Sequence, residues 1–222
     1  MIILLTNDDG YDAKRILFAK EILKKYGTVY LVAPKVEQSA KSASLTIGPI
    51  EFEKIDEYTY AVQGTPVDCV TFAIHGLNIK PDLVVSGINH GYNLGIDTIY
   101  SGTLGAALQA QYFGYKTIAF SGDYKADKLI INEFEDTLNY IIEKDLTSVN
   151  HTLNINFPPD KFIKSKGYLF TKKHLRRYEH VGRIDGNVFY RSRKYLSDKV
   201  DKDTDLYAHN NGYISITKVP LQ

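Results

Sequence analysis

The 222-residue chain carries 27 Lys and Arg residues against 26 Asp and Glu residues, which gives a formal net charge of +1. This balance creates no overall field that would favour a nucleic-acid polymer or an acidic membrane surface as a partner. Hydrophobic residues make up 44% of the chain and charged residues 24%, as is typical of globular proteins. The length suits one large domain, or a domain with an appendage.

Cysteine content and hydropathy indicate the cellular compartment. Cys69 is the single cysteine, so the chain cannot form an internal disulfide, which is typical of a reducing compartment. No apolar run approaches the roughly 18 residues of a membrane span. The amino terminus also lacks the basic start and long apolar core of a signal peptide. We therefore expect a cytoplasmic protein without a membrane partner.

The first ten residues, MIILLTNDDG, predict a buried strand of a parallel sheet that ends in a polar turn. Ligands of open α/β sheets bind beyond the carboxyl ends of the strands, where Asp8 and Asp9 stand. Two carboxylates about 4 Å apart repel each other by roughly 4 kcal/mol at an effective dielectric of about 20. A hard cation such as Mg²⁺ or Mn²⁺ would remove this repulsion. A solvated Asp-Asp-Gly turn is the alternative, but the position directly after a strand favours the cation site.

The next segments predict a βαβ unit followed by a polar loop. Residues 12–26 have the apolar spacing of an amphipathic helix, and residues 28–33 (TVYLVA) form the second strand. Residues 34–48 form a loop at the same edge of the sheet as Asp8. Its side chains can therefore reach the predicted cation site, although a flexible surface loop is an equally good interpretation; the polar residues concerned are Gln38, Ser39, Ser42 and Ser44.

Residues 50–55 and 58–62 alternate as the two strands of a hairpin, and the motif GTPVD follows. Thr65 is a good N-cap, Pro66 suits the first helical position, and Asp68 falls in the first turn. We interpret the motif as the start of a helix that runs to about residue 75. The alternative is that the same backbone amides line a nucleoside pocket.

A glycine- and asparagine-rich segment follows a predicted strand at residues 83–86. Its glycines recur every four residues, at 87, 91 and 95, with Asn89 and Asn93 between them. The spacing matches neither the dinucleotide fingerprint GxGxxG nor the P-loop. Glycines allow a backbone to approach a ligand closely, and asparagines supply neutral donors and acceptors.

The turn Ser101-Gly102-Thr103 opens a helix that is predicted to end at Tyr112. Free N–H groups and the positive end of the helix dipole suit a phosphate at this position. A capped helix that packs closely on the sheet is the alternative. The preceding glycine–asparagine segment favours the anion site.

The remaining periodicity predicts strands at 116–121 and 152–157 and a helix at 128–143. Alternation of strands and helices indicates an α/β fold, with a Rossmann-like, doubly wound, mainly parallel sheet. We expect residues 1–160 to form this catalytic core. Residues 161–222 show β-like segments at 167–171, 187–191 and 212–217 and no strong helix pattern. They predict a β-rich extension, with an arm that pairs with another subunit.

The chain resembles the SurE family of metal-dependent nucleotidases, also called survival-protein phosphatases. The similarity covers about the first 160 residues in the order and spacing of the family, and it is weak in the last third. It rests on the motifs LLTNDDG, APKVEQS, GTPVDCV, SGINHGYNLG, YSGTLGAA and LNINFP. Gln109 and Ala110 depart from the Glu and Gly that the family usually carries there.

The resemblance implies a metal-dependent phosphatase of nucleoside 5′- and 3′-monophosphates, and some members also trim polyphosphate. It implies one divalent cation per subunit, Mg²⁺ or Mn²⁺, with Ca²⁺ also able to occupy the site. It further implies homodimers or homotetramers with exchanged carboxyl-terminal arms. The implied metal ligands are Asp8, Asp9, Ser39 and Asn89; the implied catalytic residues are Asp8 and Asn93; the implied phosphate-binding residues are Asn93, Ser101, Gly102 and Thr103.

Several mechanistic alternatives stay open at this stage. The attacking group is water or Asp8, with water ranked first, and His90 is a candidate general acid. A nucleotide-binding module without catalysis would keep the phosphate turn but would not need two adjacent acids. A serine hydrolase that uses Ser101 would be expected to show GxSxG, which the chain lacks.

Overall fold

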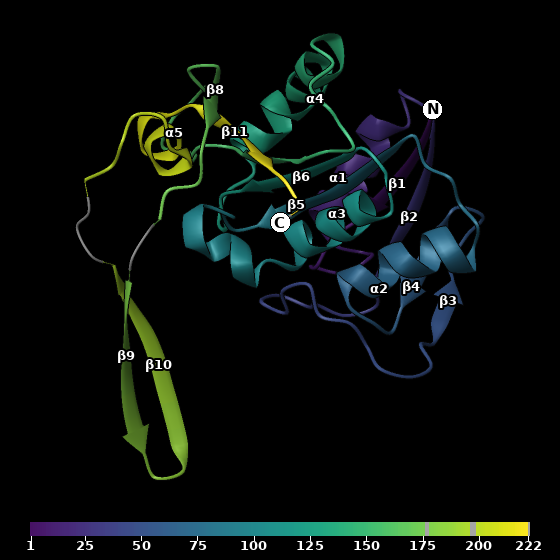
Figure 1. Cartoon of the computed structure of the whole chain (residues 1–222), viewed down its shortest axis with the longest axis horizontal. Helices are drawn as coiled ribbons and strands as arrows, with labels where there is room; N and C mark the ends of the chain where they lie inside the picture. The colour runs from purple at the N-terminus through teal and green to yellow at the C-terminus, as the bar shows by residue number, and fades with distance from the viewer. Residues whose placement is uncertain (176–177, 196–198, 222) are drawn as a thin grey trace.

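The computed structural model describes residues 1–175, 178–195 and 199–221, and these form a nine-stranded sheet between helices plus a separate hairpin (Figure 1). The order of the strands in the sheet is β3-β4-β2-β1-β5-β6-β7-β11-β8. Neighbouring strands run parallel from β4 to β7, whereas β3 and β11 are antiparallel to β4 and β7. The predicted α/β fold with a mainly parallel sheet is confirmed. The strands are β1 (Ile2–Thr6), β2 (Thr28–Pro34), β3 (Phe52–Lys54), β4 (Thr59–Val62), β5 (Leu83–His90), β6 (Thr117–Gly122), β7 (Thr152–Asn156), β8 (Tyr168–Thr171) and β11 (Ile214–Val219).

Helices cover both faces of this sheet. Apolar residues of α1 (Lys14–Leu23) and α4 (Lys128–Glu143) pack on one face, in a cluster that includes Ile16 and Phe134. On the other face lie α2 (Pro66–Thr71), the π-helical turn at Phe72–Gly76, and α3 (Gly102–Tyr112). Side chains of a strand alternate between its two faces, and those of β1 accordingly divide between the two clusters.

The strand β5 extends further than the sequence suggests, because it includes the first part of the glycine–asparagine segment. It runs to His90 and pairs with β6 across an irregularity between Ser86 and Asn89. Gly87 makes this path possible. Its φ is +124°, and a Cβ atom there would lie 2.3 Å from the carbonyl oxygen of Phe120. Strand β5 therefore carries Asn89 to the carboxyl ends of the central strands, next to the end of β1.

The predicted cap at Thr65 is confirmed as a capping box. The Asp68 amide donates to Thr65 Oγ1 over 3.2 Å, and the Thr65 amide donates to Asp68 Oδ2 over 2.8 Å. The Asp68 carboxylate also accepts hydrogen bonds from the amide and hydroxyl of Thr46. Asp68, in the first turn of α2, therefore closes the capping box and also fixes the end of the 34–48 loop.

The carboxyl-terminal third extends the main sheet with β-strands, as the sequence predicted, because strands β8 and β11 join that sheet. It differs from its prediction in one respect: a helix, α5 (Asp205–Asn211), is present where no strong helix pattern was visible. The boundary at residue 160 stays a prediction, and residues 176–177, 196–198 and 222 of the predicted extension lie outside the described residues.

Strands β9 (Tyr178–Asp185) and β10 (Val188–Tyr195) form an antiparallel hairpin that projects away from the main sheet (Figure 1). The sequence predicted only part of β10. Apolar side chains of the hairpin are well exposed, with Ile184 at 75% and Phe189 at 64%. The predicted arm thus has a structural counterpart in this chain. Within the described residues, no helix has the length and apolar character needed to cross a membrane.

Candidate functional site

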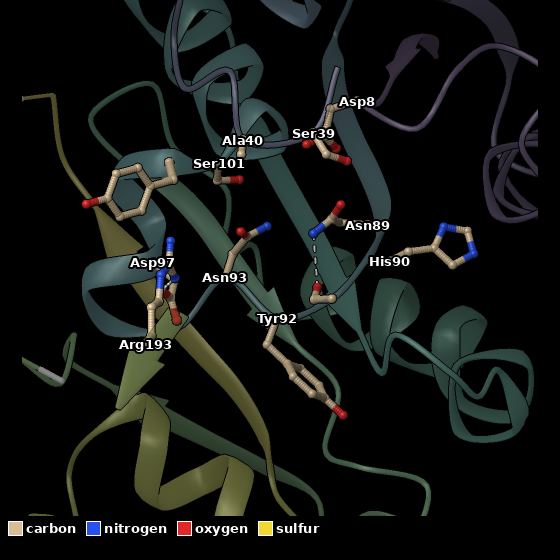
Figure 2. Close-up of a pocket in the computed structure, with 12 residues that line it drawn as sticks. Asp8, Ser39, Ala40, Asn89, His90, Tyr92, Asn93, Asp97, Ser101 and Arg193 are labelled. Carbon is tan, nitrogen blue, oxygen red and sulfur yellow. Dashed lines mark hydrogen bonds and ion pairs between the residues drawn. The ribbon is translucent and has the colours of Figure 1, made fainter. Parts of the chain in front are cut away.

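A cavity of about 270 Å³ lies at the carboxyl ends of β1 and β5 (Figure 2). The chain moves outward from β1 to β2 and β4 on one side, and from β5 to β6 and β7 on the other. Such a switch in direction is where α/β sheets bind ligands. Five of the predicted site residues, from four segments of the chain, line this cavity together: Asp8, Ser39, Asn89, Asn93 and Ser101.

Asp8 is the most buried acid in this cavity, with 3% of its surface exposed. Its Oδ1 accepts a hydrogen bond of 2.6 Å from the hydroxyl of Thr103 at the start of α3. Gly102 allows this approach, because a Cβ atom there would lie 3.0 Å from the Cβ of Asp8. Two predicted phosphate-binding residues therefore sit directly against the predicted metal ligand.

Burial changes the ionisation of Asp8. Desolvation is the largest effect and raises the pKa of the carboxyl to about 6, with a further rise from the charge of Asp9. The hydrogen bond from Thr103 opposes the shift only in part. The ionised carboxylate is thus destabilised in the protein alone, and a cation bound beside it would reverse that effect.

Asp9, the second predicted carboxylate ligand, faces a neighbouring cavity and is not among the residues that line the cavity of Asp8. Its Oδ2 accepts a hydrogen bond from the His90 amide over 3.2 Å and lies 3.1 Å from His90 Nδ1. It lines a neighbouring cavity of about 410 Å³ together with Glu37. The His90 ring points away from Asp8 and Ser101 (Figure 2). This geometry gives no support to His90 as the general acid.

The amide of Asn89 is oriented by its own chain. Its Nδ2 donates to the carbonyl of Gly91 over 3.0 Å, shown as a dashed line in Figure 2. The amide oxygen is then the atom available as a ligand. Ser39 enters the cavity from the loop after β2, and its hydroxyl donates to Glu37 over 2.7 Å. That loop is tied to the site, because the Gln38 amide donates to the carbonyl of Asp8 over 2.7 Å.

Asn93 is held by a network that the sequence analysis missed. Its carbonyl accepts hydrogen bonds from Asn154 and Asn156 of β7, at 2.9 and 3.2 Å. Its side-chain Nδ2 donates to Ser121 Oγ of β6 over 2.8 Å. The alternation of asparagines with apolar residues in LNINF was the available signal, because buried polar groups at that period need partners.

The turn at Ser101 combines the two interpretations given to it. Ser101 is the N-cap of α3, and its Oγ accepts a hydrogen bond from the Leu104 amide over 3.0 Å. The amides of Gly102 and Thr103 belong to the first turn, where an α-helix has no acceptor of its own. The capped helix, which was the alternative interpretation of this turn, is therefore present. The N-terminus of the same helix also lies at the wall of the cavity.

A buried arginine, Arg15 of α1, was not anticipated as part of the site. Its side chain is 4% exposed, and its Nη1 donates to the Asn89 carbonyl over 2.7 Å. It also forms a 2.6 Å ion pair with Asp127 and donates to the carbonyls of Asp123 and Ala126. Arg15 therefore joins the end of β5 to the segment between β6 and α4.

The donors around Asp8 suit a hard cation. Two carboxylates, the Ser39 hydroxyl and the Asn89 amide oxygen are all oxygen ligands of the kind that Mg²⁺ and Mn²⁺ prefer. Among the described residues, no group of three or more His, Cys, Asp or Glu side chains could hold a metal ion. A cation at this site would therefore need the neutral oxygens in addition to Asp8 and Asp9.

A family model described as survival protein SurE matches residues 3–180 of the chain. The chain belongs to the survival protein SurE family. It is 37% identical over 230 residues to a protein of Haemophilus influenzae strain PittEE named 5′-nucleotidase SurE, covering 99% of this chain and 91% of that one. The SurE family resemblance drawn from the motifs is thereby confirmed.

Two further relatives agree with this assignment. The 5′-nucleotidase SurE of Campylobacter concisus is 37% identical over 237 residues, covering 99% of this chain and 92% of that one. The crystal structure of the SurE protein from Aquifex aeolicus matches with a TM-score of 0.85 and 34% identity, covering 100% of this chain and 94% of that one. The similarity thus extends through the carboxyl-terminal third, where the motifs were weak.

Replacement of Arg15 by Met should destabilise the protein by about 2–4 kcal/mol, because it leaves buried carbonyls without a donor. Urea unfolding monitored by circular dichroism measures this change. Lys14→Met, at an exposed neighbour on α1, is the matched control and should change stability by less than about 0.5 kcal/mol. Equal stability of the two variants would contradict the structural role given to Arg15.

Asp8→Asn should change how the stability of the metal-free protein depends on pH. The pKa of Asp8 in the folded protein, about 6, lies above its ordinary value of 3.8, so the free energy of unfolding falls as the pH rises from about 4 to 6. In EDTA, the variant should gain about 2–3 kcal/mol over the wild type between pH 4 and 7. Thermal unfolding across this range measures the difference, and parallel profiles would refute the assignment.

Proposed function

We propose that the protein is a divalent-metal-dependent phosphomonoesterase that removes phosphate from nucleoside 5′-monophosphates, and also from 3′-monophosphates and the ends of polyphosphate. Curated relatives named 5′-nucleotidase at 37% identity over nearly the whole chain support phosphatase action on nucleoside monophosphates. The observation that carries the proposal is the hydrogen bond from Thr103 to Asp8. It joins a candidate metal ligand to a helix N-terminus suited to phosphate.

In this proposal the substrate phosphate lies in the cavity, against Asp8 and the first turn of α3, which are already in contact with each other. The cation, when bound, neutralises charge that grows on the phosphate oxygens. The amides of Gly102 and Thr103 hold a phosphate oxygen through the positive end of the helix dipole. The side chain of Asn93, fixed by Ser121, supplies a neutral polar group on the opposite wall.

Asp8 has two possible roles in the attack on phosphorus. As a base, it would accept the proton of an attacking water. As a nucleophile, it would form an aspartyl phosphate. We rank water first, because the Thr103 hydroxyl already donates to Oδ1 and restrains the carboxylate. The stereochemical course at phosphorus separates the two roles, because direct attack by water inverts the configuration, whereas formation and hydrolysis of an aspartyl phosphate retain it.

Neither rival hypothesis accounts for the site as well. A binding module without catalysis would have no need to bury one acid beside another. A serine hydrolase would need a base at Ser101, and within the described part of the chain Ser101 has no hydrogen bond to a histidine. Its hydroxyl oxygen instead caps α3. A fluorophosphonate probe should therefore fail to label the protein.

We also propose that the protein forms homodimers or homotetramers through the β9–β10 hairpin. Its exposed apolar residues, among them Ile184, Val188 and Phe189, would be costly to leave in water on a projecting arm. Pairing with a second copy would cover them, consistent with the arm exchange that the family resemblance implies. Light scattering on the purified protein measures the mass of the assembly.

The proposed function predicts phosphate release from AMP that requires Mg²⁺ or Mn²⁺ and stops in EDTA. Asp8→Asn should lower kcat by at least about 1,000-fold, because it removes a ligand and a base at once. A malachite-green assay with 5′- and 3′-nucleotides and polyphosphate, each with Mg²⁺, Mn²⁺ and Ca²⁺, measures these rates. Full activity in EDTA, or near wild-type turnover of Asp8→Asn in saturating Mn²⁺, would contradict the proposal.

A further inference from the structure

Arg193 reaches the cavity from the base of the β9–β10 hairpin. It lies across the cavity from Asp8 and Ser39, beside Asp97 (Figure 2). Its Nη1 donates to Asp97 Oδ1 over 2.9 Å. Its guanidinium carbon also lies 5.1 Å from the ring centre of Tyr100 and 4.6 Å from that of Tyr178. The arm therefore contributes one side chain to the candidate active site of its own chain.

This arginine differs from an ordinary surface residue on the same hairpin. The side chains of Arg193 and Asp97 are 29% and 19% exposed, whereas those of the pair Arg183–Asp185 are 66% and 64% exposed. An exposed ion pair restrains its members little. Between two rings and a carboxylate, the guanidinium of Arg193 is held in one place, as a ligand-binding group should be.

The position of the phosphate site decides which part of the substrate Arg193 would meet. With phosphate between Asp8 and Ser101, the ester oxygen and the leaving group must occupy the rest of the cavity, whose far wall is formed by Asp97, Tyr100 and Arg193. This assignment rests on the proposed function. The cavity, about 270 Å³, lies just below the usual size range of small-molecule sites, so a bound leaving group would lie close to that wall.

We propose that Arg193 is a specificity-determining residue that binds the nucleoside half of the substrate, with Asp97 and Tyr100 holding its guanidinium in place. A guanidinium has five N–H donors, and the contact with Asp97 Oδ1 occupies one of them. The sugar hydroxyls and the base of a nucleoside both offer acceptors to the others. Asp97 offsets the charge of Arg193, so the pair suits a neutral nucleoside better than a second phosphate.

Recognition of this kind predicts selectivity against phosphate esters without a nucleoside. A polar site that is built for hydrogen bonds rejects a ligand that cannot make them, because its own groups then lose their partners. p-Nitrophenyl phosphate has the same reacting group as AMP but has no sugar hydroxyls or base. The ratio of kcat/KM for AMP to kcat/KM for p-nitrophenyl phosphate therefore measures the contribution of Arg193. A residue that merely anchored the arm would alter both values together.

The test measures this ratio in the wild type, in Arg193→Met and in Arg193→Lys, with saturating Mn²⁺. The ratio should fall at least 10-fold in Arg193→Met and less in Arg193→Lys, which keeps the charge but loses the planar donors. Arg191→Met, at an exposed arginine on the same strand, is the matched control and should leave the ratio unchanged. Hydrolysis of ribose 5-phosphate by the same variants locates the contact. If Arg193→Met lowers kcat/KM for ribose 5-phosphate as much as for AMP, Arg193 binds the sugar; if it leaves that value unchanged, Arg193 binds the base.

An unchanged ratio in Arg193→Met, whether or not the two rates fall together, would overturn the proposal. Absence of hydrolysis of either ester with any cation would instead contradict the proposed function. In that case calorimetric titration with AMP still tests the subsite, because Arg193→Met should weaken binding at least 10-fold. Equal affinity of Arg193→Met and the wild type for AMP would again overturn the proposal.

Discussion

The hydrogen bond between Thr103 and Asp8 is the contact on which the candidate site depends. It joins the end of the first strand to the first turn of α3, across 95 residues of sequence. Gly102 makes the approach possible by leaving space beside the Asp8 side chain. The contact holds a buried carboxylate against a helix N-terminus, and each would bind one side of a metal–phosphate pair. The sheet and its two helical layers serve to bring these two elements together.

Polar side chains that do not line the cavity restrain the two asparagines that do, Asn89 and Asn93. Arg15 restrains the backbone at Asn89, and asparagines of β7 restrain the backbone at Asn93. These contacts are buried, where an unsatisfied polar group is costly, so they favour a single arrangement of the two asparagines. The arm adds a further wall to the cavity through Arg193, and the proposed role of this residue would link substrate recognition to the segment proposed for subunit pairing.

The sequence predicted the elements whose signal is local. Strand β1 and the cap at Thr65 were identified because apolar runs and capping residues are recognised from neighbouring positions in the sequence. Helix α5 was missed, since seven residues are too few for a periodic pattern, although Thr204 caps it. Strand β9 was missed because most of its side chains are exposed. Arg15 was missed because a buried cation is defined by partners more than 70 residues away.

The most direct test of the account is a crystal structure with Mn²⁺, with the ion located by its anomalous scattering. The account predicts one ion per subunit, with oxygens of Asp8, Asp9 and Asn89 about 2.0–2.3 Å from it, facing the first turn of α3. An ion bound elsewhere, or a Mn²⁺-soaked crystal in which Asp8 and Asp9 turn away from each other without an ion, would contradict it.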